Sequence, residues 1–212
     1  MPLRAQHSAF GATLSIPDRK QLGEQLCWAA VAEMVMIYWH GIDSTAPVWS
    51  QCEQARYDYY VDIGATPVDT PACVGDSIPP LFDNAGTPFD GIIPLTNAYE
   101  YIPFYGDTID WETIQRNIDR KQPVIVEWGW QGHDSSGSHF VVVDGYQISS
   151  FGARFVSYVD PWSNDLSVHK LLAFDEFINP GEIAFLDYQG YRFDGCTGYV
   201  SNIHPIGIRK KK

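Results

Sequence analysis

Residues 21–40, "QLGEQLCWAAVAEMVMIYWH", predict a helix that begins at an unusual residue. Between Cys27 and Tyr38 the apolar residues recur at the spacing of one helix face. Helices usually begin behind Ser, Thr, Asp or Asn, because these side chains accept hydrogen bonds from the first free N–H groups. A thiol caps poorly. The sequence therefore predicts a helix over 27–38, stopped by the glycine at 41, with Cys27 at its start for a reason other than helix stability.

The elements predicted around this helix change in character along the chain. A second helix is expected over 46–61, and a third over 107–123, where Trp111, Ile114 and Ile118 have helical spacing. The segment between them is dense in Pro, Gly, Asp and Thr, which favours loops around one short helix at 79–86. Strands are then expected over 123–130, 138–146, 153–162, 168–174 and 198–208, with a short helix at 175–180.

Helices that precede strands in this way are typical of the α+β class. We expect a helical half, about 21–120, packed on an antiparallel sheet half, about 121–208, with a cleft between them. Both halves would belong to a single domain over 21–208. Residues 1–20 would form an extended N-terminal lead-in, and the "RKKK" end at 209–212 a solvated basic tail.

The charge and hydropathy of the chain exclude several kinds of partner. Lys and Arg total 14 against 26 Asp and Glu, so the net charge of -12 repels phosphate and makes nucleic acid an unexpected partner. No run of about 18 apolar residues is present, so no membrane association is expected. The first 20 residues lack the apolar core of a signal peptide, so an exported protein would have lost its signal or used another route. We expect a secreted or exported monomer.

Four cysteines and six histidines are scattered along the chain. No C-x-x-C pair occurs, and the histidines do not cluster, so no metal site and no cofactor is expected. If Cys27 stays free, at most one disulfide can form. Cys52 and Cys73 are the preferred pair because they are close in sequence within a Pro/Gly-rich region, although two reduced thiols remain an alternative.

Cys27, His139 and Asp160 are the residues that could carry chemistry together. A helix N-terminus and a neighbouring imidazolium both favour a thiolate, which is the nucleophilic form of cysteine. His139 opens a predicted buried strand behind the small residues at 135–138, and Asp160 ends the next strand. If these strands are antiparallel neighbours, their ends meet, and Asp160 could hold the second nitrogen of the imidazole.

Acyl transfer also needs hydrogen-bond donors for the oxyanion. The backbone N–H of Cys27 is one candidate. A side-chain amide is the usual second donor, and Gln21 and Gln25 both precede the cysteine.

The pattern "Q-x5-C-W-A-A", then "G-S-H-F-V-V-V-D-G-Y", then "V-D-P-W" resembles the papain-like cysteine proteases, and especially their bacterial branch of secreted effector and staphopain-like enzymes. The resemblance covers about 20–165 and implies a papain-like fold and endopeptidase activity on polypeptide substrates. It implies that Cys27 is the nucleophile, His139 its proton partner, Asp160 the orienting residue, and Gln21 the oxyanion donor. The residues assigned to substrate binding are Trp28, Trp162, Gly137 and Ser138.

The sequence departs from the plant-type motif "C-G-S-C-W" and has Asp160 where Asn is usual, which points away from the plant-like subfamily. His133 and Asp144 are rival candidates for the histidine and the third residue, and Asp144 would point to the opposite face of a regular strand from His139. Two other functions stay open. The same triad serves transglutaminases, deamidases and amidases, and the fold could also be kept as a non-catalytic binding module.

Overall fold

The computed structural model describes residues 10–62, 64, 75, 77–83, 109–131, 138–162, 169–178 and 192–200. Its helices are α1 (Cys27–Ile42), α2 (Gln51–Asp62), the 3-10 turn η2 (Pro80–Phe82), α4 (Trp111–Asp119) and α5 (Phe174–Ile178). Its strands are β1 (Phe10–Thr13), β2 (Val124–Gln131), β3 (Ser138–Ile148), β4 (Arg154–Val159), β5 (His169–Ala173) and β6 (Arg192–Val200). The fold is α+β, as expected from the sequence.

The strands form one antiparallel sheet in the order β5-β4-β3-β2-β6, with β1 added beside β3. β3 is the central strand, and its first half pairs with β2 while its second half pairs with β1. β3 and β4 are antiparallel neighbours, with Val142 opposite Val159. This pairing brings the start of β3 close to the end of β4, which is the arrangement expected for His139 and Asp160.

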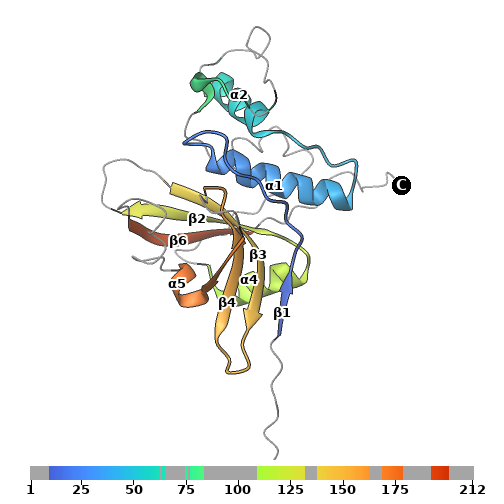
Figure 1. Ribbon diagram of the computed structural model, residues 1–212, viewed down its shortest axis with the longest axis vertical. Coiled ribbons are helices and arrows are strands. Elements are labelled where there is room, and N and C mark those ends of the chain that lie inside the picture. The colour runs from blue at the N-terminus through green and yellow to red at the C-terminus, as the bar shows by residue number, and fades with distance from the viewer. Residues whose placement is uncertain are drawn as a thin grey trace, which may run out of the picture.

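Helix α1 lies between α2 and the sheet (Figure 1). Ten of its 16 residues are buried, which is typical of a helix enclosed on most sides by the protein core. It contacts β3 on one side and α2 on the other. The N-terminus of α1 is therefore held by packing against both halves of the molecule, and not by its own cap.

Two predicted helix ends were wrong. Helix α1 continues through Gly41 to Ile42 and ends where the N–H of Asp43 donates to Trp39 O. Helix α2 begins at Gln51 and not at residue 46. Ser50 and Glu53 explain the later start, because each side chain accepts a hydrogen bond from the other residue's backbone N–H, at 3.3 and 2.8 Å. The letters "SQCE" are thus a capping box that the prediction overlooked.

The predicted sheet and loops also need correction. Within the predicted lead-in at 1–20, residues 10–13 join the sheet as β1, so a strand precedes the helices, and residues 1–9 lie outside the described part. The last described strand, β6, begins at residue 192 and not at 198, and residues 201–208 of the predicted strand lie outside the described residues. Within the helix expected at 79–86, the described residues form the 3-10 turn η2, and residues 84–86 lie outside the described part. The remaining predictions, namely α4, α5 and strands β2 to β5, agree with the structure apart from end residues.

None of the helices in the described part of the chain is long and apolar enough to cross a membrane. Cys73, Gly137, His133 and the tail at 209–212, all named from the sequence, lie outside the described residues.

Candidate active site

Cys27 is the first residue of α1, and its side chain is only 7% exposed. Leu26 is the residue before it and provides no side-chain cap in the described structure. The first intrahelical hydrogen bond runs from Ala30 N to Leu26 O, so the N–H of Cys27 is one of the helix's free N-terminal donors. No acidic residue lies in the first turn. The position therefore combines a thiol with the positive end of a helix, which favours negative charge.

His139 lies near the start of β3 and is 0% exposed. Its cross-strand partner is Trp128 on β2, and the two rings are 6.2 Å apart. Trp162, which follows β4, meets the imidazole edge-on at 6.1 Å. Two indoles therefore shield the imidazole from water, which strengthens its interactions with charged neighbours.

Asp160 follows β4 and is buried beside His139. Its Oδ1 lies 2.9 Å from Nε2 of His139 and also accepts a hydrogen bond from Trp162 N at 3.0 Å. The second contact is an Asx turn, in which Asp160 binds the backbone two residues ahead. The sequence "DPW" thus fixes the carboxylate and places Trp162 against the imidazole with the same turn.

The two buried groups shift each other's pKa strongly. Burial alone would lower the pKa of His139, but the charge of Asp160, the hydrogen bond to Asp160 and the neighbouring Cys27 outweigh it and raise that pKa to about 9. Burial alone would raise the pKa of Asp160, but His139, Lys170 and the N–H of Trp162 lower it to about 2. At neutral pH the pair is an imidazolium and a carboxylate.

The structure brings Cys27, His139 and Asp160 together. Because Nε2 of His139 bonds to Asp160, Nδ1 is the ring nitrogen that remains for Cys27, whose thiol is among the groups that raise the histidine's pKa. A thiol at a helix N-terminus beside an imidazolium is the arrangement that activates cysteine as a nucleophile. His169 and Asp144, by contrast, bond to each other at 2.9 Å and not to this group.

Gln21 lies in the loop before Cys27, but its amide is turned toward that loop. Nε2 donates to Gly23 O at 2.8 Å and to Glu24 O at 3.0 Å, which engages both of its hydrogens. Oε1 is buried without a hydrogen-bond partner. The backbone N–H of Gln21 donates to Pro161 O at 3.0 Å, so the loop is joined to the Asp160 turn. Gln25, the alternative amide, is exposed and donates its backbone N–H to Asp83.

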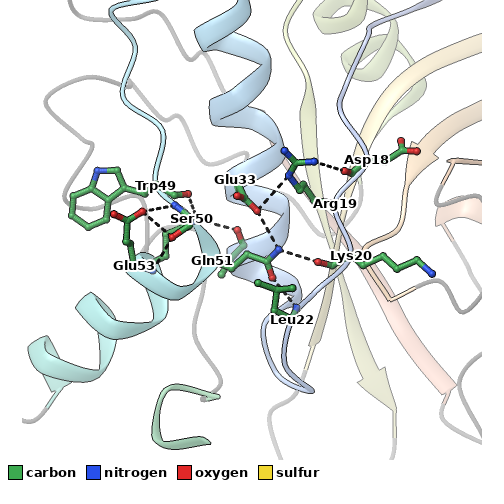
Figure 2. Close-up of polar contacts among 11 residues, drawn as sticks. Asp18, Arg19, Lys20, Leu22, Glu33, Trp49, Ser50, Gln51 and Glu53 are labelled. Carbon is green, nitrogen blue, oxygen red and sulfur yellow. Dashed lines mark hydrogen bonds and ion pairs between the residues drawn. The ribbon is translucent and has the colours of Figure 1, made fainter. Parts of the chain in front are cut away.

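Gln51 on α2 holds the chain on both sides of Gln21 (Figure 2). Its Nε2 donates to Lys20 O at 2.9 Å and to Glu33 Oε2 at 3.2 Å, and its Oε1 accepts from Leu22 N at 2.9 Å. Glu33 of α1 in turn meets Arg19 at 3.9 Å. One buried amide thus connects α2, α1 and the loop that carries Gln21.

Asp83, just after η2, holds the next part of the same loop. Its two carboxylate oxygens accept from Glu24 N and Gln25 N, each at 2.9 Å. Gly23 must be a glycine here, because a Cβ at that position would collide with the Asp83 carboxylate. Gln51 and Asp83 together fix the backbone that leads into Cys27.

A cavity of about 430 Å³ lies beside this loop. Its lining includes Gln21, Glu24, Asp83 and Trp162. Because Trp162 also contacts the imidazole of His139, this cavity borders the site and is open enough to admit a ligand segment.

The four residues assigned to substrate binding lie in different places. Trp28 belongs to α1 and is buried in the core, and its role in substrate binding stays a prediction. Trp162 lines the cavity, and Ser138 is half-buried at the start of β3. Gly137 lies outside the described residues.

Comparison with protein families now adds to this geometry. The α+β fold with its antiparallel sheet is consistent with the papain-like class of cysteine peptidases. The chain belongs to the Peptidase_C39 like family, whose model matches residues 13–182. A search of curated proteins finds no match to the chain. The family suggests cysteine peptidase activity on polypeptides.

Sequence reasoning missed Gln51, Asp83 and Lys170, which contacts Asp160 at 3.3 Å. Gln51 directly follows the capping residue of α2, so a correct helix start would have shown a glutamine in its first turn. Asp83 lies far from Cys27 in the sequence, and Lys170 lies on a different element from Asp160, so neither carries a local signal. Cys52 is disulfide-bonded, which removes the reduced alternative for this cysteine.

Proposed function

We propose that the protein is a cysteine endopeptidase in which Cys27 is the nucleophile, His139 the proton donor and acceptor, and Asp160 the orienting residue. The observation that carries the proposal is the buried imidazolium–carboxylate pair beside the thiol at the free N-terminus of α1. Membership of a family of cysteine peptidases supports it.

The proposed reaction proceeds through a thioester. The Cys27 thiolate attacks the peptide carbonyl carbon and forms a tetrahedral intermediate. The C–N bond then breaks, and the leaving amine takes a proton from the His139 imidazolium. Water, deprotonated by the neutral imidazole, attacks the thioester. The carboxylic acid product leaves, and the thiolate–imidazolium pair is restored.

The N–H of Cys27 is the first oxyanion donor in this scheme. Gln21 is the second, provided that its Nε2 exchanges the carbonyl of Gly23 or Glu24 for the substrate oxygen. Its present hydrogen bonds keep the amide in the loop that faces the cavity, so a rotation of the side chain would be sufficient.

The rate of Cys27 alkylation by iodoacetamide as a function of pH tests the thiolate–imidazolium pair. The wild type should react rapidly at a lower pH than His139→Ala, because the imidazolium stabilises the thiolate. His169→Ala is the matched control because it removes the other aspartate-bound histidine, and it should keep the wild-type profile. If the alkylation rates of the wild type and of His139→Ala depend on pH in the same way, the proposed thiolate–imidazolium pair is contradicted.

A peptide library with and without an added primary amine tests the reaction itself. A peptidase yields new amino termini that disappear in Cys27→Ala. Amine incorporation without cleavage would assign the protein to acyl transfer, and release of ammonia alone to deamidation. An unreactive Cys27 together with none of these products would favour a binding module.

We also propose that the protein is exported, supported by the disulfide at Cys52, since such bonds persist in oxidising compartments. Labelling of thiols in protein recovered from cells and from medium checks this. A reduced Cys52 in the native source would contradict export.

A further inference from the structure

The carboxylate of Asp160 has two oxygens, and the proposed mechanism uses only Oδ1. Oδ1 bonds to His139 and to Trp162 N. Oδ2 lies 3.3 Å from Nζ of Lys170. The carboxylate is buried, so a cation this close is a strong neighbour for it.

Lys170 reaches Asp160 because of its place in β5. It lies opposite Tyr158 of β4, two residues before Asp160. The Lys170 side chain is 21% exposed, so most of its aliphatic part is covered by the protein, although β5 is an edge strand of the sheet. Adjacent residues of a strand point to opposite faces, and His169 accordingly bonds to a different carboxylate, Asp144.

Lys170 supplies a positive charge that the site can use. In the reactive form, the Cys27 thiolate and Asp160 are negative and the His139 imidazolium is positive, so these three groups leave one buried negative charge, which Lys170 offsets. Among the described residues, the charged groups that act on Asp160 include His139 on β3 and Lys170 on β5, and those that act on His139 include Asp160 and Cys27. Glu127 on β2 faces away from this group, because it neighbours Trp128, the cross-strand partner of His139.

We propose that Lys170 is a positioning residue for His139: through Oδ2 of Asp160 it fixes the plane of the carboxylate and offsets part of its charge. This inference rests on the proposed function. A carboxylate shared between two cations holds the imidazolium proton less tightly than one that serves His139 alone. The imidazolium can then release its proton to the leaving amine more readily, since a general acid works best with a pKa near the working pH.

The first test is an NMR titration of ¹⁵N-histidine-labelled full-length protein, with the His139 signal assigned from its loss in His139→Gln. Lys170→Met keeps the apolar stem and removes the charge, and it should move the His139 titration upward by about one pH unit. Lys170→Arg keeps the charge and should stay at the wild-type position. Arg120→Met removes a positive charge at the exposed end of α4 and should also cause no shift.

A His139 titration that is unchanged in Lys170→Met would overturn the inference. If Lys170→Met does not fold, Lys170→Gln provides the same comparison with a polar side chain. This readout needs no substrate, so it decides the role of Lys170 even if the wild type cleaves no peptide and the proposed function fails.

The second test asks whether Lys170 acts through Asp160. With a cleavable peptide, Lys170→Met should lower kcat by about 10-fold with KM unchanged. In an Asp160→Asn background, the same change should cause no further loss. Losses that multiply in the double variant would mean that the two residues act independently, which contradicts the inference.

Discussion

Two histidine–aspartate pairs lie on the same sheet, with the same 2.9 Å separation and opposite surroundings. His139 and Asp160 are enclosed by Trp128 and Trp162 and face a thiol. His169 is 40% exposed and lies between Asp144 and Asp18, at 2.9 and 2.6 Å. A short histidine–carboxylate distance therefore does not by itself make a reactive site. The two pairs differ in the burial of the imidazole and in its other neighbour, which is the Cys27 thiol for His139 and the Asp18 carboxylate for His169.

The N-terminal segment connects the two pairs. Leu14 N donates to Asp144 O, Asp18 meets His169, and Gln21 N donates to Pro161 O beside Asp160. The segment passes the part-exposed His169 first and the fully buried His139–Asp160 pair second. The first pair therefore anchors the segment, whereas the second lies beside the thiol of Cys27.

The largest expected effect separates the two aspartates. Asp160→Ala should lower kcat/KM for a cleavable peptide by about 100-fold or more, because His139 loses the partner that orients it and keeps it charged. Asp144→Ala should change kcat/KM by less than about 10-fold, since its partner is His169. Steady-state kinetics with folded protein, verified by circular dichroism, check both values. Equal losses would show that the anchor and the site are one unit.

The second prediction concerns stability against pH. The pKa of His139 is raised from 6.5 to about 9, so the pair stabilises the fold fully below 6.5, and this contribution is lost as pH rises through 9. The loss should reach about 3 kcal/mol. Asp160, with its pKa lowered from 3.8 to about 2, contributes above 3.8 and loses this as pH falls through 2.

Urea unfolding between pH 6 and 10 measures the alkaline loss. His139→Ala should flatten this slope, whatever its overall stability, while His169→Ala should retain it. An alkaline slope that survives in His139→Ala would assign the effect to another group.

A third prediction compares two glutamines of α2. Gln51→Leu and Gln54→Leu should each lower the free energy of unfolding by about 1–3 kcal/mol, because each leaves buried backbone groups unpaired. Only Gln51→Leu should also lower kcat, by about 10-fold, since Gln54 binds Ala29 O and Trp49 O and not the loop of Gln21. A similar fall in kcat for both variants would point to a general loosening of α2.

The smallest effect is expected at the exposed anchor. Asp18→Asn should lower the free energy of unfolding by less than about 1 kcal/mol, because the ion pair with His169 is open to solvent and screened by salt. Activity should stay within about twofold of wild type. A larger loss of activity would mean that the N-terminal segment controls the site through Asp18.

The sequence by itself determined much of this protein. Helical spacing identified α1 and α4, and continuous apolar runs identified β2 and β3, because these patterns report local burial. The order Cys27, His139, Asp160 was readable because each residue stands at the end of an element whose neighbours are predictable. The end of α1 was misjudged because the glycine at 41 was given more weight than packing, and the start of α2 because the Ser50–Glu53 box was overlooked.

Only the tertiary structure decided which groups meet. It paired Asp144 with His169, buried Trp28, and brought Gln51, Asp83 and Lys170 to the loop and the carboxylate. These contacts join residues separated by 25 or more positions or lying on different elements, such as the 59 positions between Glu24 and Asp83. Periodicity describes the face on which a residue lies. Charge balance in a buried site depends on distances across the fold, and no local pattern encodes them.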